Sequence, residues 1–222
     1  MKNECINVLI ACECSQIEAK AFRRLGFTAY SCDLQQSYGG HPEWHVVGDV
    51  LPLLRGQSHF FRTEDGQQRW VYCWHLIIAH PPCTYLCQVG AAPRAYGDSD
   101  TARIFRNLMA DAAAFFRECL AADAHFVAVE NPRPTPLAGL PRHNWICYPN
   151  KFGSRWTKRT HWWLRNLPPL LPMLGENMRR STAASNRRGQ KRSESFIEVA
   201  EAMACQWGGL VKSMIEQERR NG

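Results

Sequence analysis

The sequence HLIIAHPPCTYLCQVG, residues 75–90, combines the pattern of a buried strand with an abrupt stop. Its apolar first half belongs to a run from Val71 to Ala79, which predicts a central β-strand. Pro81 and Pro82 have no backbone N–H to donate, so the strand must end before them. Cys83 is therefore presented at the carboxyl end of a strand, which is where open α/β sheets bind their ligands.

The N-terminal part of the chain has the pattern of a strand, a turn, a helix and a second strand. The predicted segments are a strand over Ile6–Cys12, a helix over residues 16–25 and a strand over Phe27–Cys32. Ser15 and Glu18 are spaced as a capping box for the helix. Asp33 ends the second strand, and an acid at that position can bind ribose hydroxyls. The order predicts a nucleoside-binding unit.

Strands and helices continue to alternate, which predicts an α/β fold of Rossmann-like type, with a mostly parallel sheet and helices on both faces. Strands are predicted at residues 46–50, 71–79, 126–129 and 161–164, and helices at residues 101–122 and 195–207. Helical spacing predicts that the first of these helices buries Ile104, Leu108, Ala112, Phe115, Phe116 and Leu120. Residues 55–70 are polar and turn-rich, and a surface loop is expected there.

Composition and charge favour a single-core globular protein with a polyanionic partner over a disulfide-rich or membrane-spanning protein. A chain of 222 residues can bury one core, and its net charge of +7 favours a polyanionic partner. Ten cysteines without a signal-peptide pattern predict reduced thiols and a cytoplasmic location. Since no apolar run approaches the roughly 20 residues that span a bilayer, no membrane association is expected.

Cys83 and Glu130 each follow a predicted strand and a proline lies close to each. If the two strands are neighbours, the thiol and the carboxylate share one pocket. A thiolate can add to an electron-poor ring, and a carboxyl group can protonate or hydrogen-bond the ring nitrogen. The alternatives are that Cys83 is one of ten small buried side chains and that Glu130 is a solvated acid at a strand end.

Three short motifs occur in order along these elements: Gly48-Asp49-Val50, the loop from Pro82 to Gly90, and Glu130-Asn131-Pro132. They resemble the Gly-Asp-Ile, Pro-Cys loop and Glu-Asn-Val motifs of DNA cytosine methyltransferases that act at carbon 5, specifically the short phage and prophage members. The segment Ala200–Ala204 is similar to the late helix that completes the cofactor pocket in that family.

The resemblance implies transfer of a methyl group from S-adenosylmethionine to carbon 5 of cytosine in DNA, with the base flipped out of a duplex. It implies that Cys83 attacks carbon 6 and that Glu130 holds N3 and the exocyclic amine. Lys158 or Arg159 would lie near the base and its phosphate, and the sequence leaves the assignment open. The cofactor-binding residues it implies are Ala11, Glu13, Cys14, Ser15, Asp33, Asp49, Pro81 and Glu201. The base-binding residues it implies are Pro82, Gln88, Gly90, Asn131 and Arg133, and no metal is expected.

The chain departs from the family in two places. The turn after the first strand is not glycine-rich, and only a basic linker lies where longer members carry a target-recognition domain. The expected organisation is a catalytic core over residues 1–165, a Pro/Arg/Ser-rich arm over 166–195 and a helix over 196–222 that completes the core. Phosphate contacts carry no sequence information, so we expect short or absent sequence specificity, or dependence on single strands, a partner protein or an oligomer. Residues 84–98 are expected to close over the flipped base.

Other interpretations remain open on the sequence. The same chemistry could act on RNA or on a cytidine nucleotide. A non-catalytic protein with the same fold could bind nucleic acid, for which basic charge and eight tryptophans are suitable. A zinc-dependent cytidine deaminase would use His41-Pro42-Glu43 and the pair Cys83 and Cys87, although that cysteine spacing is one residue too long.

Overall fold

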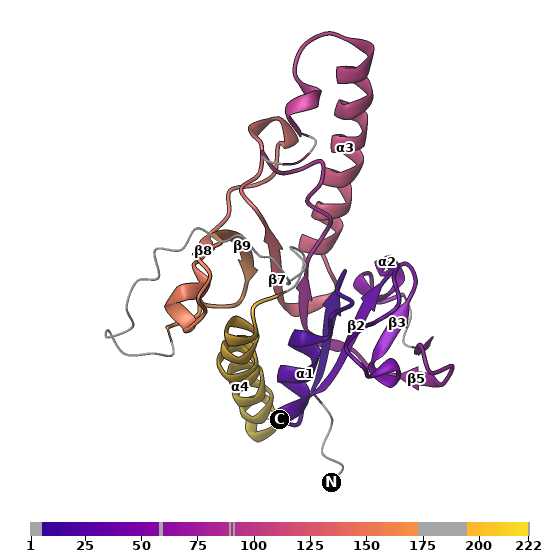
Figure 1. Ribbon diagram of the computed structural model, residues 1–222. Coiled ribbons are helices and arrows are strands. Elements are labelled where there is room, and N and C mark those ends of the chain that lie inside the picture. Colours follow the sequence, from indigo (N-terminus) through magenta and orange to yellow (C-terminus); the bar gives the residue numbers. More distant parts are fainter. Residues whose placement is uncertain (1–5, 58–59, 89, 91, 173–194, 222) are drawn as a thin grey trace.

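A seven-stranded, mostly parallel sheet forms the centre of the protein (Figure 1), as seen in a computed structural model that describes residues 6–57, 60–88, 90, 92–172 and 195–221. The strand order is β3-β2-β1-β6-β7-β9-β8, and β9 runs antiparallel to both of its neighbours. The strands of this sheet are β1 (Asn7–Ala11), β2 (Thr28–Asp33), β3 (His45–Val47), β6 (Trp74–Ala79), β7 (Ala124–Asn131), β8 (Trp145–Cys147) and β9 (Thr160–Arg165). The helices are α1 (Ile17–Arg24), α2 (Leu51–Leu54), α3 (Asp100–Leu120) and α4 (Ile197–Asn221).

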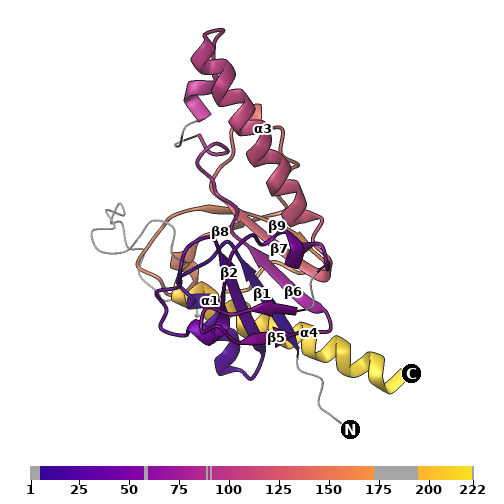
Figure 2. The same cartoon turned by 90° about the vertical axis from the view of Figure 1, so that its right-hand side faces the viewer.

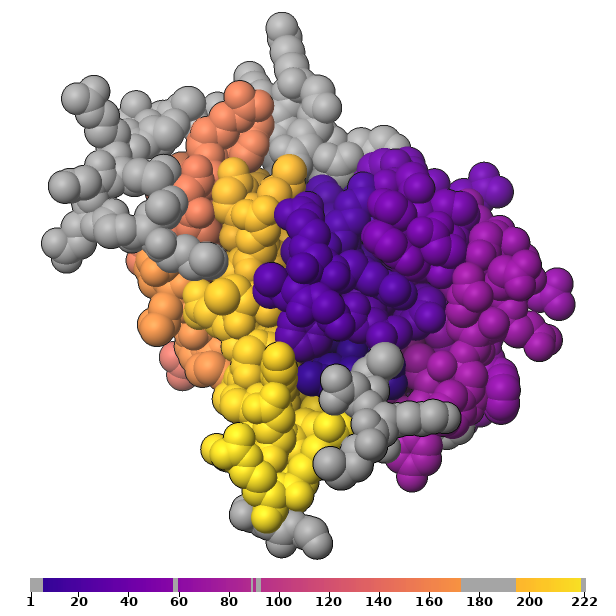
Figure 3. Space-filling model, turned by 90° about the horizontal axis from the view of Figure 1, so that it is seen from below, coloured from indigo at the N-terminus to yellow at the C-terminus, as the bar shows by residue number. Residues whose placement is uncertain are grey.

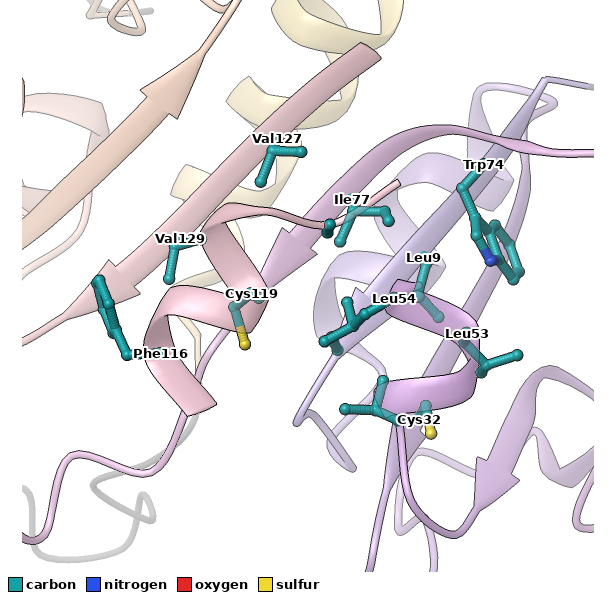
Figure 4. Packing of buried hydrophobic residues seen from close by; sticks show 14 of the residues in the cluster. Leu9, Cys32, Leu53, Leu54, Trp74, Ile77, Phe116, Cys119, Val127 and Val129 are labelled. Atoms are coloured by element: carbon teal, nitrogen blue, oxygen red, sulfur yellow. The ribbon is translucent and has the colours of Figure 1, made fainter. Parts of the chain in front are cut away.

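Helices cover both faces of the sheet because alternate side chains of each strand point to opposite sides. Leu9, Ile77 and Val127 point to one face, where they pack with α2 and α3 (Figure 4). Residues one position away on the same strands, such as Ile10 and Ile78, pack with α1 and α4 on the other face. The predicted α/β class and mostly parallel sheet are confirmed.

The carboxyl ends of four parallel strands meet at one edge of the sheet. Ala11 of β1 is in register with Cys32 of β2 and with Ala79 of β6, and Ala79 is in register with Val129 of β7. The residues that follow these positions are therefore neighbours in space. The strands that precede Cys83 and carry Glu130 are adjacent, as a shared pocket requires.

Helix α3 differs from its predicted burial pattern. Ser99 caps it through a hydrogen bond from the Ala102 amide, and Phe116 is fully buried as expected. Ile104, however, is 57% exposed and Leu108 is also exposed. Figures 1 and 2 show the reason: the N-terminal half of α3 extends beyond the sheet. The spacing of apolar residues correctly predicted that this segment is helical. Its burial prediction failed in the first turns, because no sheet lies against them.

The prediction that residues 55–70 form only a surface loop is wrong. Two short strands, β4 (Phe60–Arg62) and β5 (Gln68–Trp70), form an antiparallel hairpin there. Phe60 pairs with Trp70 across the hairpin, and Phe61 points inward to the core. Three-residue strands are too short to show a periodic pattern, and β8 was missed for the same reason.

Helix α4 runs alongside α1, and the two lie in direct contact when the protein is viewed from below (Figure 3). Trp207, Met203 and Val199 form its buried side against the sheet. The helix extends to Asn221, which is beyond the helical pattern of residues 195–207 and within the predicted C-terminal helix over residues 196–222. Most of the predicted basic arm, residues 173–194, lies outside the described residues. None of the described helices is both long enough and apolar enough to cross a membrane.

Candidate functional site

Cys83 begins a tight turn that is fastened to the next strand. Its carbonyl oxygen accepts hydrogen bonds from the amides of Leu86 and Cys87, each at 3.0 Å. The amide of Thr135, just beyond β7, donates to the carbonyl oxygen of Leu86 at 2.7 Å. A side chain at Gly90 would collide with the carbonyl oxygen of Thr84, so glycine is required where the loop closes. The turn thus holds Cys83 beside the end of β7.

The Cys83 thiol is half-buried and keeps its proton at neutral pH. Burial, followed by the neighbouring Cys87 thiol and the charge of Glu130, raises its pKa to about 11, while the ammonium of Lys158 opposes the shift. The thiol, the carboxylate and the ammonium are therefore electrostatic neighbours, although they come from three separate segments. A thiol with this pKa must lose its proton at the moment it acts as a nucleophile.

Two side chains at the end of β7 have a buried oxygen atom that lacks a hydrogen-bond partner within the described part of the chain. These atoms are Oε1 of Glu130 and Oδ1 of Asn131. Asn131 uses its amide nitrogen to donate to the carbonyl oxygen of Pro81 at 3.4 Å. A buried acceptor without a donor costs about 1–3 kcal/mol. The site therefore presents two oxygen atoms that a ligand with N–H groups can satisfy.

His80 joins this site, although the sequence analysis did not single it out. Its Nε2 donates to Oε2 of Glu18 at 2.8 Å, and its Nδ1 lies 3.6 Å from Oε2 of Glu130. Burial disfavours the charged imidazole, but the charge of Glu18, its hydrogen bond to the ring and the nearby Glu130 carboxylate outweigh it and raise the pKa of His80 to about 10. The three residues are far apart in the sequence, so no local pattern could have identified them.

A cavity of about 40 Å³ lies against these groups, on the α4 side of the sheet. Its walls are formed by Glu18, His80, Glu130, Cys147, Lys158, Thr160, Trp162, Ser195, Phe196, Val199 and Met203. This volume holds about three water molecules, at 10–15 Å³ for each. The cavity is too small for a pyrimidine ring, which could enter only if the side chains that line it were displaced.

The turn after β1 is built differently from the predicted capping box. The Glu13 carboxylate accepts the amides of the two residues that precede α1, those of Ser15 at 2.6 Å and Gln16 at 2.9 Å. The Ser15 hydroxyl accepts the amide of Ile17, the first residue of α1, at 3.3 Å. Glu18 instead points to His80, because a cationic imidazole is a stronger partner than a backbone amide. Burial, with the charge of Glu18, raises the pKa of Glu13 to about 7.

Other predicted residues of this turn lie at the same edge. Ala11 is fully buried, and its carbonyl oxygen accepts the amide of His80 at 2.9 Å. Cys14 is half-buried and accepts the amide of Tyr38 at 3.0 Å through its carbonyl oxygen. Cys12, between them, has a φ of 59°, which is unusual for a residue with a side chain.

A second cavity, of about 380 Å³, brings together the predicted acids Asp33 and Asp49. It is lined by Cys12, Cys32, Asp33, Leu34, Gln35, Gly48, Asp49, Val50, Pro82 and Phe115. Each acid uses one oxygen to fix its own backbone: Asp33 accepts the amide of Gln35 at 2.9 Å, and Asp49 accepts that of Leu51 at 3.0 Å. The cavity combines carboxylate acceptors with apolar walls and is the size of a small-molecule site.

Some of the remaining predicted residues lie at the two cavities and others lie on the surface. Pro81 is buried. Pro82 lines the larger cavity and Lys158 lines the smaller one. The exposed Gln88 is tied to the exposed Arg133, whose carbonyl oxygen accepts the Gln88 amide at 3.2 Å.

Arg159 is exposed. Burial lowers the pKa of the neighbouring His161 to about 4, and the charges of His143 and Arg159 add to the shift. Glu201 is not brought to either cavity. It lies on the surface of α4 and pairs with Arg24 of α1 at 3.0 Å.

The raised pKa of His80 predicts a pH dependence of folding stability. The folded protein keeps a proton that the unfolded chain releases near pH 6.5, so this stabilisation is complete below pH 6.5 and is lost as pH rises toward 10. We expect urea unfolding between pH 7 and 9 to show a falling free energy of unfolding for the wild type, and a shallower fall for His80→Gln. Equal slopes for the two proteins would contradict the assignment.

The described residues contain no group of three His, Cys, Asp or Glu side chains placed to hold a metal ion. His41 of the deaminase-like pattern instead contacts Glu43 at 3.1 Å and stacks on Trp44. Comparison of the chain with protein-family models gives no match, and comparison with curated proteins gives none either.

Proposed function

We propose that the protein transfers a methyl group from S-adenosylmethionine to carbon 5 of cytosine in DNA. The observation that carries the proposal is the placement of Cys83 and Glu130 at the ends of adjacent parallel strands, β6 and β7. The Cys83 turn is anchored to the segment after β7, and Oε1 of Glu130 there is buried without a hydrogen-bond partner among the residues that the structure describes. This pairing supplies a nucleophile and a ring-binding carboxyl group in one place.

The larger cavity suits the nucleoside part of the cofactor. Asp33 would take the ribose hydroxyls and Asp49 the adenine amine, because both acids have an oxygen not used by the hydrogen bonds described above. Leu34, Val50 and Phe115 would pack against the adenine ring. When bound, the cofactor supplies an electrophilic methyl group.

The chain's own residues provide the activation of the base. The Cys83 thiol passes its proton to the Glu130 carboxylate as its sulfur forms a bond to carbon 6 of cytosine, and Glu130 delivers that proton to N3. Glu130 holds N3 and the exocyclic amine, so that negative charge on the ring is neutralised by a proton at N3. Carbon 5 is then electron-rich. Once carbon 5 carries the methyl group, its proton passes to solvent water and the carbon–sulfur bond breaks. The N3 proton returns through Glu130 to the sulfur, which restores the aromatic ring and the thiol.

The experiment that tests this function is transfer of tritiated methyl groups from S-adenosylmethionine to duplex DNA, single-stranded DNA, RNA and dCMP. We expect transfer to DNA, with the label recovered as 5-methylcytosine after digestion. If label were found only in RNA or dCMP, the substrate would be RNA or a cytidine nucleotide and not DNA. Cofactor binding without transfer to any of the four would contradict the enzymatic proposal.

The cofactor assignment predicts the effect of changing either acid in the larger cavity. Asp33→Asn and Asp49→Asn should each weaken binding of S-adenosylmethionine by about 10- to 100-fold, because each removes a hydrogen bond to a charged group. Asparagine keeps the local backbone contacts, so the fold should be retained. Isothermal titration calorimetry measures the change. Glu216→Gln on the exposed end of α4 is the matched control, and equal affinities for all four proteins would refute the assignment.

A further inference from the structure

The imidazole of His80 connects two carboxylates from opposite sides of the smaller cavity. Glu18 comes from α1 and is almost fully buried, with 1% of its side chain exposed. Glu130 comes from β7, and its Oε2 faces Nδ1 of His80 at 3.6 Å. Its other oxygen, Oε1, has no hydrogen-bond partner within the described residues. The histidine therefore engages one oxygen of Glu130 and leaves the other for a ligand.

The surroundings favour a histidine that carries a proton on both ring nitrogens. Each nitrogen faces a carboxylate, and an imidazolium is the form with two N–H donors. The titratable or charged groups that face His80 or share its cavity are Glu13, Glu18, Glu130, Cys147 and Lys158. The part of α4 that lines the cavity adds only Val199 and Met203, which carry no charge.

We propose that His80, held by Glu18, is a positioning residue that orients Glu130 toward the substrate base. The inference rests on the proposed function, because it assigns Glu18 and His80 to the same reaction. His80 does not touch the base in this account. Its positive charge balances Glu130, and its position fixes which carboxyl oxygen is available for N3 and the exocyclic amine.

The proton balance of the step gives a readout that needs no cofactor. As the sulfur of Cys83 bonds to carbon 6, the thiol proton passes to the Glu130 carboxylate and from it to N3. Carbon 5 then gains a deuteron from heavy water, which leaves deuteroxide. Deuteroxide takes the original proton of carbon 5, the sulfur leaves with the bonding electron pair, and the N3 proton returns through Glu130 to the sulfur. The net result is exchange of hydrogen for deuterium at carbon 5, with His80 remaining charged.

The first test is the titration of His80 in the wild-type protein, followed by nitrogen-15 NMR of the imidazole and assigned by the signal lost in His80→Gln. We expect both ring nitrogens to remain protonated at pH 8.5, since the pKa is raised to about 10. In Glu18→Gln the ring should titrate closer to its ordinary value of about 6.5. A wild-type ring that titrates near 6.5 would overturn the proposal, whatever reaction the protein catalyses.

The second test is deuterium exchange at carbon 5 of cytosine in an oligonucleotide, measured by mass spectrometry without cofactor. His80→Gln should lower the maximal rate by about 10- to 100-fold while KM for DNA changes little. Glu18→Gln should move the loss of activity at high pH from near 10 toward neutral pH. Glu216→Gln is the control.

Unchanged rates and pH profiles in both variants would overturn the role of His80. Absence of exchange in the wild type would instead refute the proposed function, and with it the role of His80 in catalysis. The NMR titration would still establish or exclude the charged Glu18–His80–Glu130 contact.

Discussion

Cys83→Ser is expected to lower methyl transfer to DNA by on the order of 10³-fold or more. Serine has nearly the same shape, but its hydroxyl holds its proton far more strongly than a thiol and cannot add to carbon 6 at neutral pH. Burial already raises the pKa of the Cys83 thiol to about 11, so the site has little capacity to activate a weaker acid. The measurement is the initial rate of tritium incorporation into DNA at saturating cofactor.

The matched control for this substitution is Cys205→Ser. Cys205 is an exposed residue of α4, and serine there should leave the rate within about twofold, as for other surface changes. Calorimetry should give the same cofactor affinity for all three proteins, because the cavity with Asp33 and Asp49 is lined by neither cysteine. Undiminished transfer by Cys83→Ser would exclude the covalent mechanism.

Glu130→Gln is expected to lower the rate by about 10²- to 10⁴-fold, the range for loss of a group that transfers a proton. Glutamine retains a hydrogen-bonding side chain of the same length but cannot deliver a proton to N3. It also removes the carboxylate that faces His80, so the charged imidazole keeps only Glu18 as a carboxylate partner. The initial rate and the melting temperature should be measured together.

Measuring both the rate and the melting temperature of Glu130→Gln distinguishes an effect on the reaction from an effect on folding. Because glutamine replaces glutamate with little change in volume, a drop in rate with an unchanged melting temperature assigns the loss to the reaction. Glu216→Gln makes the same chemical change at an exposed position and should affect neither quantity. Wild-type rates for Glu130→Gln would mean that this carboxylate does not act on the base.

Local sequence rules predicted the frame of the site. The proline stop placed Cys83 at a strand end, and the acids after strands, Asp33 and Asp49, line one cavity. This worked because parallel strands bring their carboxyl ends to one edge, which makes position along the strand predictive of position in space. The same rule predicted that Glu130 lies near Cys83.

Features that depend on distant contacts were not predictable from the sequence. Glu18 has the spacing of a capping residue, and only the pairing of β1 with β6 brings it to His80. On α4, Ala200 and Met203 are buried against the sheet. Glu201, however, is one residue further round the helix, about 100° from Ala200, and is exposed. Ile104 has the right spacing for burial but lies where no sheet supports α3.

The most direct test of the central claim is trapping on DNA that contains 5-fluorocytosine. Fluorine replaces the proton that must leave carbon 5, so an enzyme that adds Cys83 to carbon 6 cannot complete elimination after methyl transfer. We predict a single adduct with the combined mass of protein, methylated oligonucleotide and no lost fluoride, mapped by digestion to the peptide that contains Cys83. Methylation of ordinary cytosine with no adduct on the fluorinated DNA, or an adduct on another cysteine, would contradict the account.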